Sequence, residues 1–245
     1  MEFSLFWGGA YDNSYIRRVA DSVCFLPKKL VRVEMSAESL RRYTNLAATI
    51  HLLSCRKITL LDPSNWDDKN DAFFLAEYKR RKKVNTVLAL CFAKSPETYH
   101  HWRVFSHGCD GVCIEFDKEA LTDAFSGDGR VTADFVNYKK LNDLDSLMSG
   151  ASVDHLPFLK RYPFKDEHEF RVVFTDKRAR DELKQYEIAL EGIKRITLSP
   201  WMPKPFIEPV KDTIRKLARQ ESIQIYRSTL IENEKWKSFA SHIGT

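Results

Sequence analysis

The stretch EHEFRVVF, residues 167–174, alternates between two kinds of side chain with the two-residue period of a β-strand. One face is mostly apolar and consists of His168, Phe170, Val172 and Phe174. The other face is charged and consists of Glu167, Glu169 and Arg171. β-Branched and aromatic residues favour strands, so we predict one here with its apolar face turned to a core. The charged face is then either a solvated sheet surface or the wall of an active site.

The composition is that of an ordinary globular protein. Of 245 residues, 43% are hydrophobic and 30% are charged, which is enough for one large domain or two small ones. The net charge of +5 is compatible with an anionic ligand but does not by itself indicate nucleic-acid binding.

The first residues, the apolar runs and the cysteines indicate the cellular compartment of the protein. The first residues have no basic region ahead of an apolar stretch, and no apolar run approaches the ~20 residues needed to cross a bilayer. The five cysteines are odd in number and scattered, which is typical of reduced thiols. We therefore expect a cytoplasmic protein without a membrane partner.

The order of predicted elements favours an α+β fold. We predict a helix capped by Ser36 in the segment 36–46, with helical apolar spacing over 45–53. Further strands are predicted at 56–61, 84–93, 111–117, 193–198 and 223–226, a hairpin-like pair at 131–138, and helices at 72–83 and 205–220. Because strands and helices interleave irregularly, we expect one domain over 35–245 with a mixed, mostly antiparallel sheet flanked by helices. Residues 1–34 are then an N-terminal extension packed on it.

Two clusters could hold a metal. The loop WDDKND, residues 66–71, offers carboxylates for a hard cation, but a cap for the helix at 72–83 is the favoured interpretation. The histidines and cysteines between 100 and 113 match no usual zinc spacing, so no metal ligands are assigned.

The strand predicted at 111–117 also carries a carboxylate on its polar face, like the stretch 167–174. Glu115 points away from the apolar face formed by its neighbours, as Glu167 and Glu169 do. The two strands either converge on one cleft or both present wet faces. Trp102 is a candidate stacking surface for a flat ligand, although a tryptophan at helical spacing is usually a core residue.

Taken in order, four elements resemble one family. They are Tyr43-Thr44, the stretch LDPSNWDDKND at 61–71, HWRVFS at 101–106 with GVCIEF at 111–116, and Lys160 with ExExR at 167–171. The chain resembles the bacterial domain-of-unknown-function family 2971 over roughly residues 40–230. It departs from the family where Ala72 replaces a usual proline, where His101 replaces a usual methionine, and where Phe164 replaces a usual tryptophan. This resemblance implies no particular reaction.

The layout is more distantly similar to that of ADP-ribosyltransferases, and this similarity implies site residues. Glu169 or Glu167 would be the catalytic carboxylate, with Glu115 beside them. NAD would be the substrate, and its binding residues would be Arg42, Tyr43, Thr44, Trp102 and Arg171. In this arrangement Tyr43 or Trp102 stacks on the nicotinamide, and Arg42 or Arg171 meets phosphate.

Three functions remain open from the sequence. The first is an NAD-using ADP-ribosyltransferase or glycohydrolase that acts as a toxin or phage-defence effector on a nucleic-acid or protein target. The second is a metal-dependent nuclease or phosphodiesterase built on Asp67, Asp68, Asp71, Glu115 and Glu167. The third is a non-catalytic binding module in which Glu167, Glu169 and Arg171 form an ion-pair ladder. The sequence leaves the oligomeric state undetermined.

Overall fold

A computed structural model describes residues 38–243 except 107, 149 and 220–222. The proposed N-terminal extension, residues 1–34, lies outside the described residues. Ser36–Thr245 clusters as one unit.

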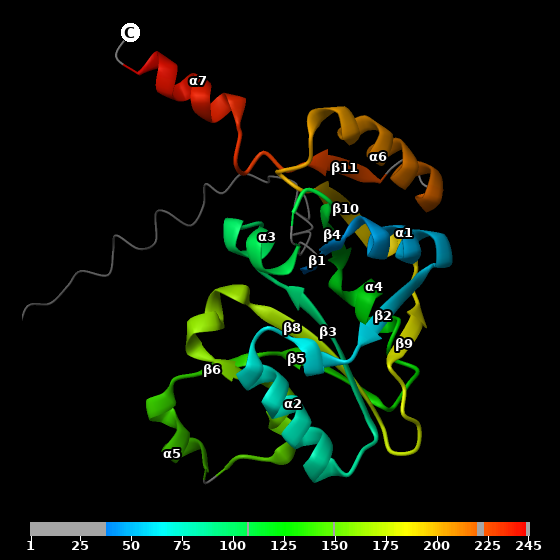
Figure 1. Cartoon of the computed structure of the whole chain (residues 1–245), viewed down its shortest axis with the longest axis vertical. Helices are drawn as coiled ribbons and strands as arrows, with labels where there is room; N and C mark the ends of the chain where they lie inside the picture. The colour runs from blue at the N-terminus through cyan, green and yellow to red at the C-terminus, as the bar shows by residue number, and fades with distance from the viewer. Residues whose placement is uncertain (1–37, 107, 149, 220–222, 244–245) are drawn as a thin grey trace, which may run out of the picture. The chain divides into compact units, whose positions relative to one another are not determined.

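Nine strands of the described residues form one sheet, shown in Figure 1. They are β1 (Ser39–Asn45), β2 (Lys57–Leu61), β3 (Thr86–Ala93), β4 (Gly111–Asp117), β5 (Val131–Phe135), β8 (Glu169–Asp176), β9 (Leu183–Glu187), β10 (Ile193–Leu198) and β11 (Gln224–Arg227). The main path runs β11-β10-β4-β1-β3-β2-β9, and β8 joins β3 to β5. Within this sheet the described pairings are antiparallel except β10–β11. The short strands β6 (Asn137–Lys139) and β7 (Leu159–Arg161) pair in parallel. The predicted α+β fold with a mostly antiparallel sheet is confirmed.

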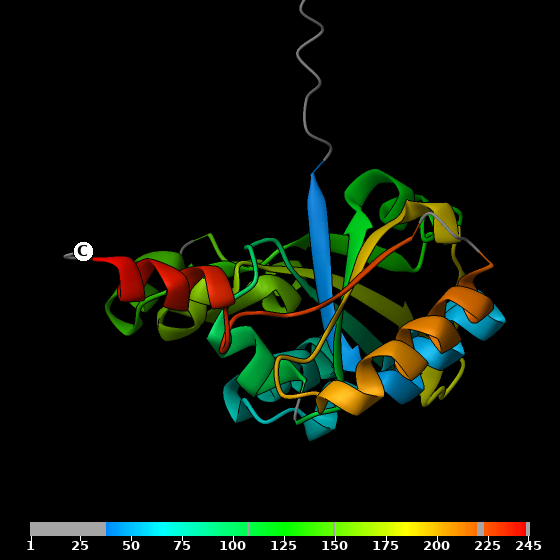
Figure 2. The same ribbon diagram turned by 90° about the horizontal axis from the view of Figure 1, so that it is seen from above.

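Helices flank this sheet. They are α1 (Leu46–Cys55), α2 (Lys69–Lys82), α3 (Tyr99–Phe105), α4 (Lys118–Asp123), α5 (Leu144–Met148), α6 (Lys204–Ala218) and α7 (Glu234–His242). Figure 2 shows α1 and α6 side by side, whereas α7 projects away from the sheet. No helix in the described part of the chain is long and apolar enough to cross a membrane.

The sheet divides between β1 and β3. β1 pairs with β4 over its whole length, from Ser39 to Asn45. Its recorded pairing with β3 is the single register Arg41↔Ala93. β3 pairs with β8 along all eight of its residues. The two strands therefore diverge, and the backbone edges that face each other there are left without ladder partners.

Several predicted elements need correction. Residues 39–45 form a strand, not a helix, because pairing with β4 outweighs local helical spacing. Asn45 then caps α1, since its side chain accepts a hydrogen bond from the Ala48 amide. The pair predicted at 131–138 is not a hairpin, because β5 pairs with β8 while β6 pairs with β7.

The opening strand also begins later than predicted. Glu167 ends a 3-10 helix, η4 (Tyr162–Glu167), and β8 starts at Glu169. Between them His168 is exposed, with a left-handed backbone at φ 43°. His168 therefore does not share the core face. The other apolar residues of the stretch do lie in the core, as predicted: Phe170, Val172 and Phe174.

One glycine is required by close packing. A Cβ on Gly111, at the start of β4, would lie 2.6 Å from the Ser106 carbonyl oxygen. We expect Gly111→Ala to lower the free energy of unfolding by about 1–3 kcal/mol, because backbone has to move to relieve this contact. Urea denaturation measures the change. Gly127→Ala is the matched control, since no atom lies within 4 Å of its added Cβ. Equal stability of the two variants would contradict the packing argument.

Candidate functional site

A pocket of about 650 Å³ opens where β1 and β3 diverge. It is lined by Arg41, Arg42 and Tyr43 of β1, residues 89–93 of β3, Leu61, residues 65–68, Asp71, Val104, Phe105, Lys160, Phe164, Glu167 and Glu169. This volume lies within the range of small-molecule and cofactor sites. The pocket thus has a cationic strand on one side and a group of carboxylates on the other.

Arg171 binds two of the pocket's carboxylates, those of Glu169 and Asp71. Its guanidinium is fully buried and donates to Glu169 Oε1 at 2.7 Å and Oε2 at 2.9 Å. It also donates to Asp71 Oδ1 at 2.8 Å and Oδ2 at 2.6 Å. A fifth contact reaches the Pro157 carbonyl at 2.7 Å. Two bidentate pairs fix the planar guanidinium, and through it both carboxylates, in one geometry.

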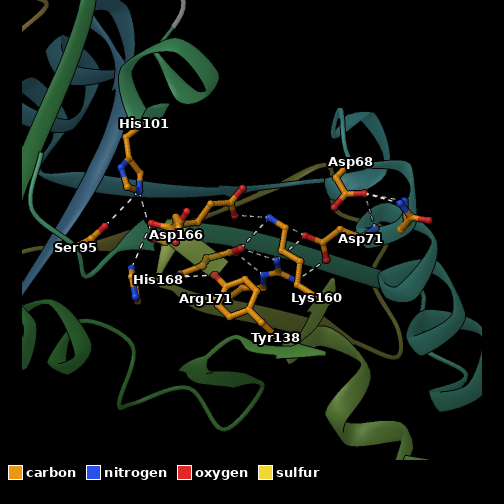
Figure 3. A network of polar contacts seen from close by, with 12 residues as sticks. Asp68, Asp71, Ser95, His101, Tyr138, Lys160, Asp166, His168 and Arg171 are labelled. Atoms are coloured by element: carbon orange, nitrogen blue, oxygen red, sulfur yellow. Dashed lines mark hydrogen bonds and ion pairs between the residues drawn. The ribbon is translucent and has the colours of Figure 1, made fainter. Parts of the chain in front are cut away.

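Lys160 joins the same carboxylates from another side, as Figure 3 shows. Its Nζ lies 2.6 Å from Glu167 Oε2, 3.2 Å from Glu169 Oε2 and 3.5 Å from Asp71 Oδ2. Three carboxylates and two cations give the cluster a formal net charge of −1 when all are ionised. This cluster is a negatively charged wall at the pocket.

The pKa values of the three carboxylates in the cluster are shifted in different directions. Burial alone would raise the pKa of Glu169, but the charges of Arg171 and Lys160 outweigh it and lower that pKa to about 2. Burial raises the pKa of Glu167 and of Asp71 despite their cationic partners. Glu167 Oε2 is engaged by Lys160, whereas Oε1 receives no hydrogen bond from the residues that the structure describes. Of the three carboxylates in this cluster, Glu167 is therefore the one with an oxygen left for a ligand.

Arg42 is the distinctive cation of the opposite wall. Its Nη1 donates a long hydrogen bond of 3.5 Å to the Cys91 carbonyl, and it forms no ion pair with any carboxylate in the described part of the chain. Burial lowers its pKa to about 10. A desolvated guanidinium without a counter-ion favours an anionic ligand.

Arg41, by contrast, is already paired. It donates to Glu115 Oε1 at 3.1 Å and to the carbonyls of Lys94 and Ser95. Glu115 also accepts from Arg195 at 2.5 Å. Glu115 does not line the pocket, and its carboxylate is neutralised by these two arginines.

The structure brings together four of the predicted site residues: Arg42, Tyr43, Glu167 and Glu169. Tyr43 is 8% exposed and stacks on His101 with a centroid distance of 5.2 Å. Thr44, Trp102, Arg171 and Glu115 do not line the pocket. Trp102 is fully buried and donates through Nε1 to Glu97, so it has no ring face open to a ligand. Arg171 is saturated by carboxylates and lies beneath the site.

The charged face of the opening stretch is thus not a solvated sheet surface, because Glu167 and Glu169 line the pocket. Glu169 and Arg171 pair, as in the ladder hypothesis, but both are buried. The sequence placed Asp71 beside Glu167 only in the metal-dependent nuclease hypothesis, and it gave Lys160 no predicted partner. It missed Phe105 and Cys91, which line the pocket, and Trp66 as the ring beneath Arg171 at 4.9 Å. The signal that could have found Asp71 is the buried arginine itself, which requires carboxylate partners.

The acidic residues of the metal-dependent nuclease hypothesis have other partners in the structure. Asp68 caps α2 by accepting from the amides of Asn70 and Asp71, which confirms the capping interpretation of the acidic loop. Asp71 and Glu167 do approach a shared cation, but that cation is the Lys160 ammonium. Among the described residues no group of three or more His, Cys, Asp or Glu is arranged to hold a metal ion.

Comparisons with known proteins add little to this geometry. No protein-family model matches the sequence, so the resemblance to family 2971 stays a prediction. No curated protein matches either. Among solved structures, DarT of Thermus sp. 2.9 in complex with NAD+ is similar at 10% identity and a TM-score of 0.40, covering 79% of this chain and 96% of that one. The same protein in complex with ADP-ribosylated ssDNA matches with the same identity and TM-score, covering 78% and 94%. Likeness at this level carries no functional argument, which has to come from the pocket.

The state of Glu169 predicts a pH dependence of stability. Its pKa in the folded protein is about 2, below the unfolded value near 4.5, so its contribution is present above pH 4.5 and is lost as the pH falls towards 2. We expect Glu169→Gln to be less stable than the wild type at pH 6, by an amount on the order of 3 kcal/mol, and the difference to shrink as the pH falls from 5 to 2. Urea denaturation across this range measures it. A difference that does not change with pH would show that Glu169 is not held ionised by the cluster.

Proposed function

We propose that this protein is an NAD-using ADP-ribosyltransferase or NAD glycohydrolase with Glu167 as its catalytic carboxylate. The observation that carries the proposal is that two groups of opposite charge line one pocket without pairing with each other. Arg42 is a desolvated cation without a carboxylate partner, and Glu167 is a buried carboxylate with one oxygen not engaged by the described protein.

A dinucleotide would satisfy both groups at once. Its pyrophosphate would supply the anion that Arg42 lacks, since guanidinium binds phosphate oxygens with charge-assisted hydrogen bonds. A ribose hydroxyl would donate to the open oxygen of Glu167. Aromatic residues of the lining, including Trp66 and Phe105, offer surfaces for the flat rings. The unpaired edges of β1 and β3 offer backbone groups to a carboxamide.

The charge of the cluster suits the chemistry of NAD cleavage. When the bond between nicotinamide nitrogen and ribose C1′ breaks, its electron pair leaves with nicotinamide and positive charge develops on the ribose. A net charge of −1 fixed beside the ribose stabilises this charge without reorganisation. In a glycohydrolase a water oxygen then bonds to C1′ and releases a proton to solvent. In a transferase a nucleic-acid or protein group bonds to C1′ and releases its proton in the same way.

The cellular role follows from the chemistry proposed. NAD is a shared cofactor, so uncontrolled consumption would harm the cell that holds the enzyme. This would suit a toxin or a phage-defence effector. A non-catalytic binding module would use the same pocket without turnover, and the experiments below separate these cases.

Glu167→Gln tests the catalytic assignment. We expect nicotinamide release to fall by roughly 100-fold or more, because the amide keeps the shape but removes the charge that stabilises the transition state. The Kd for NAD, measured by calorimetry, should change little. Asp166→Asn is the control, since Asp166 is an exposed neighbour outside the pocket lining. Wild type that binds NAD but releases no nicotinamide, with or without DNA, RNA or protein extract, would instead indicate a binding module.

Arg42→Met tests the anion site. We expect the Kd for NAD to rise about 10- to 100-fold, the loss of a charge-assisted hydrogen bond worth about 1.5–3 kcal/mol. The variant should unfold at the same or a higher temperature than the wild type, because a half-buried cation without a counter-ion is removed. Arg80→Met, on the exposed end of α2, is the matched control. Unchanged NAD affinity would remove Arg42 from the proposed site.

A further inference from the structure

The turn before β8 holds Glu167 in an unusual backbone setting. His168 has φ 43°, in the left-handed region that residues other than glycine seldom adopt. Its amide donates to the Lys165 carbonyl at 3.2 Å, and its own carbonyl accepts from the Lys94 amide at 2.9 Å. Such backbone states persist when surrounding contacts hold them, at about 1–3 kcal/mol each.

His101 of α3 supplies a contact on the other side of this turn. Figure 3 shows its ring pointing from α3 towards Ser95 and the turn that carries Asp166 and His168. The Nε2 atom lies 3.3 Å from the Glu167 carbonyl oxygen and 3.4 Å from Ser95 Oγ. The Nδ1 atom lies 2.5 Å from Thr98 Oγ1. His101 is fully buried, and its ring stacks on Tyr43 with an interplanar angle of 13°.

These contacts determine which ring nitrogen carries the proton. A carbonyl oxygen only accepts, so the Glu167 contact requires a hydrogen on Nε2. The Thr98 hydroxyl can then donate to Nδ1 while its oxygen accepts from the His101 amide at 3.2 Å. Burial lowers the pKa of His101, which agrees with a neutral ring. The ring is thus a fixed donor aimed at the backbone of Glu167.

We propose that His101 is a positioning residue: its Nε2–H holds the Glu167 carbonyl and so fixes the direction in which the Glu167 side chain enters the pocket. This inference rests on the proposed function for its catalytic consequence. The physical link is short, because the Glu167 carbonyl and side chain are attached to one Cα, so a shift of the backbone at that Cα would also shift the carboxylate relative to Lys160. A displacement of about 1 Å at a reacting group can reduce the rate roughly 100-fold.

Two substitutions separate positioning from packing. His101→Phe keeps a ring to stack on Tyr43 but removes the donor. His101→Gln loses the ring but places an amide N–H near the position of Nε2. A purely structural role makes activity follow stability, so the phenylalanine variant would be the more active one. Positioning predicts the reverse order. His100→Phe, on the exposed neighbour of His101, is the control.

We expect kcat for nicotinamide release to fall about 10- to 100-fold in His101→Phe with KM nearly unchanged, and His101→Gln to recover most of the loss although it unfolds at a lower temperature. Full activity of His101→Phe, or equal loss in both variants, would overturn the proposal. Hydrogen exchange gives a readout that does not need turnover. The His168 amide should exchange faster in His101→Phe than in the wild type, and equal rates would overturn the inference. Wild type that neither binds nor cleaves NAD would count against the proposed function alone.

Discussion

The arrangement of the pocket depends on one buried cation. Arg171 has no exposed surface, and a guanidinium in that position is stable only when its donors are matched by acceptors. Its partners come from distant parts of the chain: Glu169 on β8, Asp71 on α2 and Pro157 in the 3-10 helix η3 (Val153–Phe158). Loss of any one acceptor would leave a buried N–H donor of the guanidinium unsatisfied. The network therefore holds β8, α2 and η3 in a single relative position, and the acidic wall of the pocket inherits that rigidity.

The sheet supplies the second requirement, which is space. A strand paired on both edges has no free backbone groups, whereas β1 is paired with β4 and nearly unpaired towards β3. Arg42 and the Lys160 cluster both line the pocket at this divergence. Among the described residues Arg42 forms no ion pair with the carboxylates of this cluster, so charges of opposite sign line one pocket without neutralising each other. A ligand with an anionic part and a part that becomes cationic during reaction fits such an arrangement better than a uniformly charged one.

How far the sequence predicted this site depends on the range of the interactions. Alternation placed Phe170, Val172 and Phe174 in the core, because the period of a strand is a local property. It failed at Glu167 and His168, where a left-handed residue interrupts the alternation before β8. It also gave a helix for 39–45, since pairing with β4 is not visible in local spacing. Asp71 and Arg171 are 100 residues apart, and no local pattern records their contact. The family resemblance quoted both positions but not their meeting.

Arg41 and Arg42 differ in their partners because alternation along a strand turns them to opposite faces of the sheet. They are adjacent and of the same type, so composition cannot distinguish them. In β1 they point to opposite faces, and the register sets Arg41 opposite Glu115 but Arg42 opposite Ile114. Arg41 therefore finds a carboxylate within the sheet and is used in holding β1 to β4. Arg42 finds an apolar neighbour and is left with a carbonyl at 3.5 Å. Such a half-buried, unpaired cation lowers stability, and this is the physical reason for which we propose Arg42 as the residue that meets an anionic ligand.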